Sequence, residues 1–316
     1  MSSEHLHSLV NEIGADSVYI LMHAGYSQEV RSNRWHFATR WARFLPVVFV
    51  APETPWPGTV LGEEPRIANA RMLKVVPNRG SLWRGPARIQ IAQILNDMER
   101  TGARRPILWL YNAFFAEAFC NLPAAARVHH ISENYFDYPS MSQTYLDRVK
   151  LVSRAADLNV AVSSGCARPL RGVVEDERLM TATNGADFAV YGNAVAPDPE
   201  MLLLKRGFEK LAVFAGVIDD RLDFDLIAEA ADALPEAVFV LIGPARLTIR
   251  SGAGLKRVLE RPNVRKLDEV DPDRLPSIYR AADVGFIPYV LEDWIARNGF
   301  PLKALEMAAT GLPVVS

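Results

Sequence analysis

Residues 298–316, with the sequence NGFPLKALEMAATGLPVVS, place a lysine and a glutamate near the start of a predicted helix. Pro301 suits the first turn of a helix, where its missing N–H would be unpaired anyway, so we expect the helix to begin there. Lys303 then lies in the first turn, and Glu306 follows three residues later on the same face. Unpaired N–H groups at a helix start attract phosphate, and a carboxylate can accept hydrogen bonds from two ribose hydroxyls. The pattern predicts a nucleotide site, and a capped helix with a surface ion pair is the alternative.

The residues after this helix complete a unit of an α/β sheet. Gly311 is a helix stop signal, and Pro313-Val314-Val315 is typical of the start of a buried strand. The segment is therefore predicted to be a loop, a helix and a strand in succession.

The same segment resembles the nucleotide-sugar-binding motif of GT-B-fold glycosyltransferases, in particular those of family 4 (group 1). That motif is a Glu, seven residues, a second Glu, a small-residue helix, Gly, Pro and Val-Val. Glu306 matches the second Glu and residues 308–315 match the tail, whereas Asn298 replaces the first Glu. The spacing Pro301-x-Lys303-x-x-Glu306 is similar to a bacterial branch of group 1 in which a Lys stands beside the Glu.

The resemblance extends to residues 216–223 and 239–244. In the wider family a Gly-Arg pair and a nearby Lys bind the diphosphate. Here Val217 replaces that Arg, and Arg221 is the nearest basic residue, with a solvated position at a helix start as its alternative role. The resemblance implies that the sugar nucleotide contacts Gly216, Arg221, Asn298, Gly299, Phe300, Pro301, Leu302, Lys303 and Glu306.

Apolar runs separated by helical patterns predict a parallel sheet in each half of the chain, covered on both faces. No G-x-G-x-x-G opens the first helix, which argues against a dinucleotide cofactor, and no other cofactor is expected. The predicted strands of the first half are 17–23, 46–51, 72–76, 107–111, 128–131, 158–162 and 179–183. Those of the second half are 211–216, 237–243, 264–267 and 283–288, followed by the strand at Pro313.

The first helix, expected at 32–45, carries basic and aromatic residues together. Phe37, Trp41 and Phe44 share one face by helical spacing, so they either touch a membrane surface or, as we prefer, pack on the sheet. Residues 31–36 resemble the entry to the first helix in the group 1 branch, which implies that Arg34 and His36 face the acceptor.

Polar residues follow two predicted strands of the first half, where ligands bind in open α/β sheets. Adjacent His129 and His130 point to opposite sides of their strand, so at most one faces a given site. His130 and Glu133 are the candidates for acceptor contact or general base, with a structural role as the alternative. Ser163 is predicted to cap a helix, or else to contact an acceptor hydroxyl.

The composition is that of a globular protein of two domains, with 49% hydrophobic and 23% charged residues among 316. The net charge of −2 lacks the excess of basic residues that is typical of nucleic-acid-binding proteins. The two cysteines, Cys120 and Cys166, have no metal-ligand spacing and fit a reducing compartment. The polar N-terminus has no signal-peptide pattern, so a cytoplasmic location is expected.

Together these features predict an α/β protein of two Rossmann-like domains with parallel sheets, arranged as in GT-B enzymes. The expected boundaries are 1–190 for the acceptor domain, 191–208 for the linker and 209–316 for the nucleotide-sugar domain, which the resemblance implies is incomplete at Ser316. The implied reaction is sugar transfer from a nucleoside diphosphate sugar to a glycan or lipid-linked acceptor, retaining and metal-independent, with peripheral membrane contact. The alternatives are a nucleotide-sugar epimerase of the same fold and an inactive binding or scaffold protein.

Overall fold

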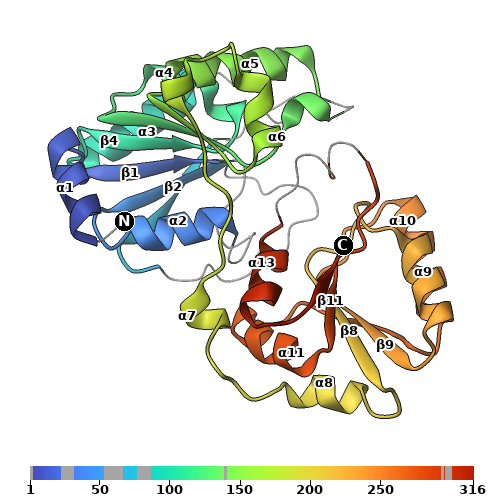
Figure 1. Ribbon diagram of the computed structural model, residues 1–316. Helices are drawn as coiled ribbons and strands as arrows, with labels where there is room; N and C mark the ends of the chain where they lie inside the picture. Colours follow the sequence, from blue (N-terminus) through green and yellow to red (C-terminus); the bar gives the residue numbers. More distant parts are fainter. Residues whose placement is uncertain are drawn as a thin grey trace. The chain divides into compact units, whose positions relative to one another are not determined.

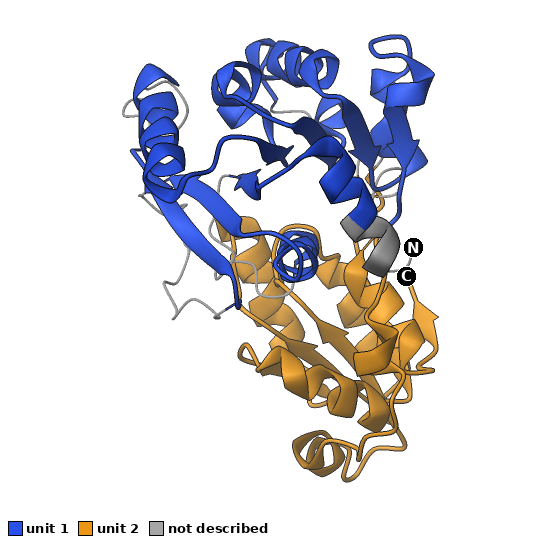
Figure 2. Cartoon of the chain, turned by 90° about the vertical axis from the view of Figure 1, so that its left-hand side faces the viewer, with its two compact units in different colours: residues 1–183, 297–300 blue, residues 184–296, 301–316 orange. Residues whose placement is uncertain are grey.

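The structure, a computed structural model, describes residues 3–22, 32–52, 67–76, 87–138, 141–292, 295 and 301–316. These residues form two compact units, one ending at Thr183 and the other beginning at Asn184 (Figure 2). Residues 191–208, the expected linker, belong to the second unit and include the short helix α8 (Pro199–Leu204). Among the described residues, no helix combines the length and the apolar composition that a membrane crossing requires.

The first unit is built on a seven-stranded parallel sheet of order β3-β2-β1-β4-β5-β6-β7. In its centre Val18 lies opposite Val47 on one neighbouring strand and Ile107 on the other. The strands are β1 (Ser17–Leu21), β2 (Val47–Pro52), β3 (Ala70–Val75), β4 (Pro106–Leu110), β5 (Ala126–Ile131), β6 (Leu158–Ala161) and β7 (Leu179–Thr181).

Helices cover both faces of this sheet, because β1 alternates buried side chains between two apolar cores (Figure 1). Tyr19 and Leu21 pack with α3, α4 and α5, whereas Val18 and Ile20 pack with α1 and α2. Phe37, Trp41 and Phe44 pack against the second of these cores, which confirms core packing for this aromatic face. The helices are α1 (Ser3–Ile13), α2 (Asn33–Trp41), α3 (Ala87–Thr101), α4 (Ala116–Asn121), α5 (Gln143–Ala155) and α6 (Ser164–Ala167).

The second unit has a five-stranded parallel sheet of order β10-β9-β8-β11-β12. Its strands are β8 (Lys210–Ala215), β9 (Ala237–Ile242), β10 (Val264–Leu267), β11 (Val284–Phe286) and β12 (Val314–Val315). Helices α9 (Phe224–Ala233) and α10 (Ile249–Leu259) cover one face (Figure 1). The other face is covered by α7 (Phe188–Tyr191), α8, α11 (Leu275–Ala281) and α13 (Leu302–Ala309).

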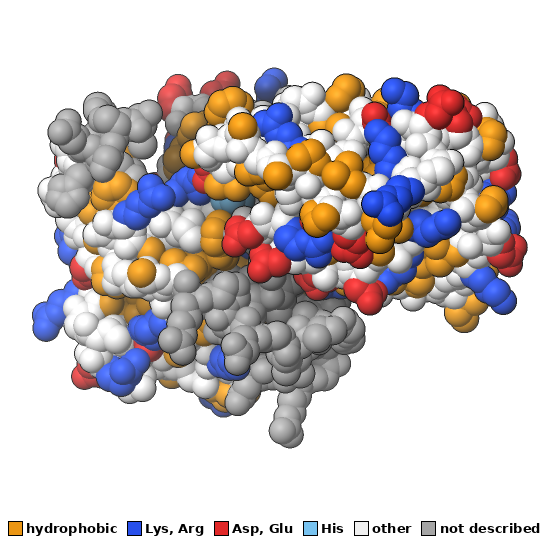
Figure 3. Space-filling model, turned by 90° about the horizontal axis from the view of Figure 1, so that it is seen from below, with side chains coloured by type: hydrophobic (Ala, Val, Ile, Leu, Met, Phe, Trp, Pro, Cys, Tyr) orange, Lys and Arg blue, Asp and Glu red, His pale blue; other side chains and the backbone are white. Residues whose placement is uncertain are grey.

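Charged side chains of both signs share the surface. In the face drawn in Figure 3, Lys and Arg side chains are interspersed with Asp and Glu side chains. This mixing agrees with the small net charge of −2.

Candidate functional site

The second sheet reverses its winding between β8 and β11. These two strands are neighbours, but the chain leaves β8 for α9 on one face and leaves β11 toward α13 on the other. In open α/β sheets, ligands bind at such a switch point, beyond the carboxyl ends of the strands. Of the candidate residues that the structure describes, Gly216, Lys303 and Arg221 lie at that place.

Gly216 directly follows β8, and its backbone, at φ +148°, is one that only glycine adopts easily. A Cβ atom at this position would overlap the Nζ atom of Lys303, and one at Gly243 would overlap the carbonyl of Gly216. Gly243 also has a positive φ, of +135°. Glycine at position 216 therefore leaves room for Lys303 at the carboxyl end of β8, and glycine at position 243 leaves room for the Gly216 carbonyl.

Helix α13 supplies Lys303 and Glu306. It begins at Leu302 rather than at Pro301, because Pro301 has an extended backbone (φ −69°, ψ 127°) and precedes the first helical residue. The helix ends at Ala309, and its C-cap Thr310 is followed by Gly311 with φ +81°, as the stop signal predicts. Glu306 is 8% exposed, so this carboxylate is largely withdrawn from solvent. Asn298, Gly299 and Phe300 lie outside the described residues.

The ammonium group of Lys303 rests on two aromatic rings. Its Nζ atom lies 3.9 Å from the centre of the Phe214 ring and 5.3 Å from that of Tyr289. Desolvation by burial lowers the pKa of Lys303 to about 7, and the positive charge of Arg221 acts in the same direction. The charges of Asp219 and Glu306 oppose this shift. We call Phe214, Gly216, Tyr289, Lys303 and Glu306 the lysine site.

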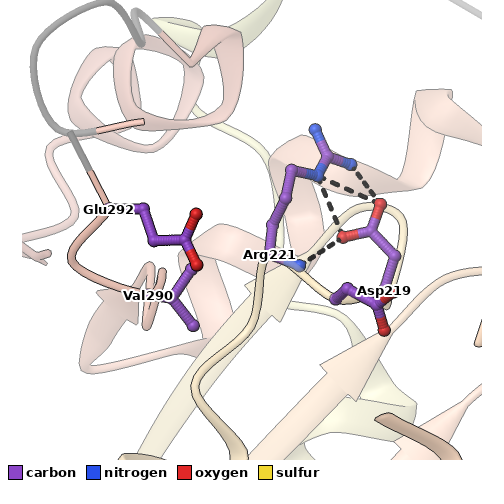
Figure 4. A pocket seen from close by; sticks show the side chains of 5 residues that line it. Asp219, Arg221, Val290 and Glu292 are labelled. Atoms are coloured by element: carbon purple, nitrogen blue, oxygen red, sulfur yellow. Dashed lines mark hydrogen bonds and ion pairs between the residues drawn. The ribbon is translucent and has the colours of Figure 1, made fainter. Parts of the chain in front are cut away.

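Arg221 lies beside the lysine site, but Asp219 holds its guanidinium. The Arg221 Nε and Nη2 atoms donate to the Asp219 carboxylate at 2.8–3.0 Å, and Arg221 Cζ lies 5.8 Å from the centre of the Tyr289 ring. Figure 4 shows this forked pair at the edge of a hollow lined by Asp219, Asp220, Arg221, Val290 and Glu292. The alternative role of Arg221 was a solvated residue at a helix start. Its side chain is indeed partly exposed, at 39%, but it forms an ion pair with Asp219.

Backbone hydrogen bonds join the chain after β8 to the chain after β11. The N–H of Val290 donates to the carbonyl of Arg221, and that of Asp223 donates to the carbonyl of Pro288, both at 2.8 Å. Leu222 and Tyr289 form an antiparallel bridge between these bonds. The pairing fixes Tyr289 and Arg221 relative to one another.

In the first unit, His130 lies at the carboxyl end of β5 in an aromatic cluster. Its ring stacks on Tyr111 at 4.7 Å between centres and meets Phe37 edge-on at 5.0 Å. The indole N–H of Trp109 donates to His130 Nδ1 at 3.3 Å, which places the histidine proton on Nε2. The buried Nε2 has no hydrogen-bond partner among the described residues. Burial, followed by the positive charge of Arg34, lowers the pKa of His130 to about 3.

His129 faces the other side of β5, as strand alternation predicts. Its Nδ1 lies 3.0 Å from Ser153 Oγ and 3.3 Å from Asn159 Oδ1, inside the core. Only His130 therefore shares the surroundings of Arg34.

Arg34 and His36 lie on α2 but in different surroundings. Arg34 is buried, with its Cζ 5.1 Å from the centre of the Tyr111 ring. His36 is partly buried, and its Nδ1 lies 3.3 Å from Arg40 Nη1. The structure thus brings Arg34 to His130. We call Arg34, Phe37, Trp109, Tyr111 and His130 the histidine site.

Glu133 and Ser163 both follow strands of the first sheet. Glu133 is exposed and accepts a hydrogen bond from the Tyr138 hydroxyl at 3.1 Å. The Ser163 hydroxyl accepts a hydrogen bond from the N–H of Cys166 at 3.1 Å, so the predicted cap of α6 is confirmed.

Most of the second unit resembles a known family of proteins. Residues 209–316 match the family described as "Glycosyl transferases group 1". We call residues 209–316 the group 1 domain after this match. Over 140 residues the chain is 32% identical to a Bacillus subtilis (strain 168) protein named "Putative teichuronic acid biosynthesis glycosyltransferase TuaH". This match covers 44% of the chain and 34% of that relative, so the chain spans about a third of its length.

Solved structures of similar fold cover nearly the whole chain. Sucrose-phosphate synthase from Thermosynechococcus elongatus has a TM-score of 0.69 at 14% identity, over 95% of this chain and 80% of the other. Anabaena Alr3699/HepE in complex with UDP-glucose has a TM-score of 0.66 at 16% identity, over 94% and 79%. At this identity the likeness concerns the fold, which is the predicted GT-B fold.

Four aromatic residues of the two sites escaped the sequence analysis, whereas Phe37 was noted there as a residue that packs on the sheet. Phe214 and Tyr289 in the group 1 domain, and Trp109 and Tyr111 in the first unit, read in the sequence as ordinary buried residues. A signal was present, since each lies at or just before the carboxyl end of a strand beside a switch point, or in the segment that follows it. Their roles depend on which distant side chain reaches them, and this only the fold determines.

Proposed function

We propose that this chain transfers a sugar from a nucleoside diphosphate sugar to a hydroxyl group of an acceptor, in the synthesis of a cell-surface polysaccharide. The observation that carries the proposal is the lysine site. It sets a cation and a withdrawn carboxylate on one helix, beside a glycine at the switch point of a group 1 domain. The name of the Bacillus subtilis relative supports the part of the proposal that concerns polysaccharide synthesis.

The diphosphate and the ribose of the nucleotide each have candidate partners in the group 1 domain. The amides at the start of α13, from Leu302 onward, and Lys303 would receive the diphosphate. Glu306 would accept the two ribose hydroxyls. The negative charge that develops on the departing nucleoside diphosphate needs a fixed cation, which Lys303 would supply, with Arg221 as a more distant second charge.

The histidine site and Glu133 are the candidates for the acceptor. Since Nδ1 of His130 accepts from Trp109, His130 has a proton to give at Nε2 but no free lone pair with which to take one. It would therefore hold an acceptor oxygen by donating a hydrogen bond. Exposed Glu133 is the better candidate for a base, and Arg34, His36 and Ser163 are further acceptor-side candidates.

Calorimetric titration of the purified chain with UDP, GDP and ADP tests the proposal. UDP comes first, because the Anabaena structure holds UDP-glucose. The variant Glu306→Ala should weaken binding by about 10- to 100-fold, since it removes hydrogen bonds to a charged acceptor. The matched control, Glu229→Ala, removes an exposed carboxylate of α9 in the same domain and should leave binding unchanged. Absence of binding by the folded chain would overturn the proposal.

Product analysis then separates transfer from the other activities that a nucleotide site could serve. Turnover that depends on an acceptor supports transfer, conversion of donor without acceptor marks an epimerase, and binding without turnover marks a binding protein. The proposal includes a retaining, metal-independent reaction, which the anomeric coupling constant of the product and turnover in EDTA would test. A cytoplasmic location and membrane contact stay predictions, which cell fractionation and vesicle binding would test.

A further inference from the structure

Lys303 is held by aromatic faces where an ion pair would be expected. Phe214 is fully buried on β8, and its ring centre lies 3.9 Å from the lysine nitrogen. The Tyr289 ring lies 5.3 Å from the same nitrogen, on a segment that the bridge to Leu222 fixes. Among the described residues, no hydrogen-bond or ion-pair partner reaches this nitrogen. The negative faces of the two rings are therefore attractive contacts of this nitrogen.

The charged groups around Lys303 do not substitute for these rings. Arg221 and Asp219 act on it with opposite sign, and they neutralise one another in their forked pair. Glu306, on the same helix, attracts the ammonium but is the group that the proposed function assigns to the ribose. Among the described residues, aromatic faces thus provide the local stabilisation of the charged lysine.

We propose that Phe214 and Tyr289 are positioning residues, which hold the ammonium group of Lys303 at the carboxyl end of β8 and keep it able to take up a proton when a nucleoside diphosphate binds. This inference rests on the proposed function for its ligand, but its claim about Lys303 concerns the free protein. Ring faces stabilise a cation without occupying its N–H groups, so the three donors of the ammonium remain available for phosphate oxygens.

The consequence is a coupling between nucleotide binding and protonation. With a pKa of about 7, Lys303 is largely neutral at pH 8 in the free protein. The negative charge of a diphosphate favours the charged lysine, so binding at pH 8 should take up most of one proton.

The direct test is a pH titration of the Lys303 side chain by NMR of its ε-carbon, in the free protein. Phe214→Leu keeps an apolar cover but removes the ring face, so the pKa of Lys303 should fall by about one pH unit. The matched control, Phe239→Leu, changes a buried ring on the neighbouring strand in the same core, and should leave this pKa unchanged. Equal pKa values in the two variants, or a rise in Phe214→Leu, would overturn the proposal.

Tyr289→Leu provides a second route if Phe214→Leu does not fold. Because the Tyr289 ring is partly exposed and lies farther from the nitrogen, the expected fall in the pKa of Lys303 is smaller but in the same direction. An unchanged pKa in this variant would remove Tyr289 from the proposal.

UDP titrations at pH 6 and pH 8 connect the rings to the ligand. Phe214→Leu should lose up to about tenfold in affinity at pH 8 and about twofold at pH 6, whereas Phe239→Leu should lose the same factor at both. In two buffers of different ionisation enthalpy at pH 8, the wild type should take up a proton that Lys303→Met does not. If UDP fails to bind the wild type, the proposed function fails, but the NMR titration still decides whether the rings position Lys303.

Discussion

Each of the two units buries a titratable base among aromatic rings, but the two bases differ in their charge at physiological pH. Each sheet winds outward from a central switch point, and each presents its base at the carboxyl edge, His130 in the first unit and Lys303 in the second. Burial lowers both pKa values, to about 3 for His130 and about 7 for Lys303. His130 is therefore neutral across the physiological range, whereas Lys303 changes charge within it.

The difference lies in the neighbouring charges and in the intrinsic basicity of the two groups. The strongest charge acting on His130 is the positive charge of Arg34, which adds to burial. Lys303 starts from a much higher pKa, and the negative charges of Asp219 and Glu306 work against its burial. The same architecture thus yields a permanently neutral hydrogen-bond donor in the first unit and a lysine whose charge depends on pH in the second.

The largest effect is expected from adding one carbon beside Lys303. Gly216→Ala adds a Cβ that would overlap the lysine nitrogen and requires a strained backbone, so UDP affinity should fall by at least about 100-fold. Gly252→Ala is the control, since it lies inside α10 with negative φ and room for a Cβ, and should slightly stabilise the domain. Calorimetry and thermal unfolding would check both, and full affinity in Gly216→Ala would refute the close approach.

The second-largest loss of UDP affinity is expected when Lys303 itself is replaced. Lys303→Met should weaken UDP binding about 10- to 100-fold at pH 6, and less at pH 8, where the wild-type lysine is already largely neutral. Lys256→Met, at an exposed position of α10, should change neither value. Equal losses for Lys303→Met at both pH values would mean that Lys303 stays charged throughout, and the contrast with His130 would lose its basis.

The neutral histidine makes its own prediction, about acid stability. The folded-state pKa of His130 lies below its unfolded value, so the unfolded chain binds the proton first as the pH falls. The contribution of the neutral histidine to the free energy of unfolding should therefore be fully present above about pH 6.5. Below that pH it should decline, by up to about 1.4 kcal/mol per pH unit for each such histidine. His130→Phe should reduce this slope in urea unfolding between pH 6.5 and pH 4.5. His129 should keep a share of it, because its pKa is also lowered, to about 4. Parallel pH profiles for wild type and variant would contradict the burial argument.

The smallest effect is expected from Arg221. Asp219 already neutralises it and much of the side chain is exposed, so Arg221→Ala should change UDP affinity by less than about tenfold. The comparison is Lys303→Met, measured by the same calorimetry. If Arg221→Ala costs more than Lys303→Met, Arg221 is the main phosphate cation and the ranking of the two must be reversed.

The sequence predicted the framework closely because both sheets are parallel and their strands read as apolar runs. Strand β10 was placed at 264–267 and lies there, and the other strands agree within about two residues at most ends. Helices α1, α5 and α10 were missed, the last because Ser251, Gly252 and Gly254 are weak helix formers. The start of α10 does carry a signal, since the Thr248 and Ser251 side chains cap each other's N–H groups.

The site was predictable only as far as local spacing reaches. Lys303 and Glu306 are neighbours on a helix by periodicity alone, so their partnership could be read from the sequence. The contact of Lys303 with Phe214 could not, because it joins a helix to a strand far earlier in the chain. The pairing of Arg221 with Asp219 over two residues was local, but its turn geometry has no simple sequence pattern.

The backbone pairing between the segments after β8 and β11 has a consequence for redesign. A loop exchange that replaces residues 217–223 alone would leave the N–H of Val290 and the carbonyl of Pro288 without their present partners. The two segments should accordingly be transplanted together when a new nucleotide or sugar preference is grafted onto this domain. They form one exchangeable module, assembled from two places in the gene.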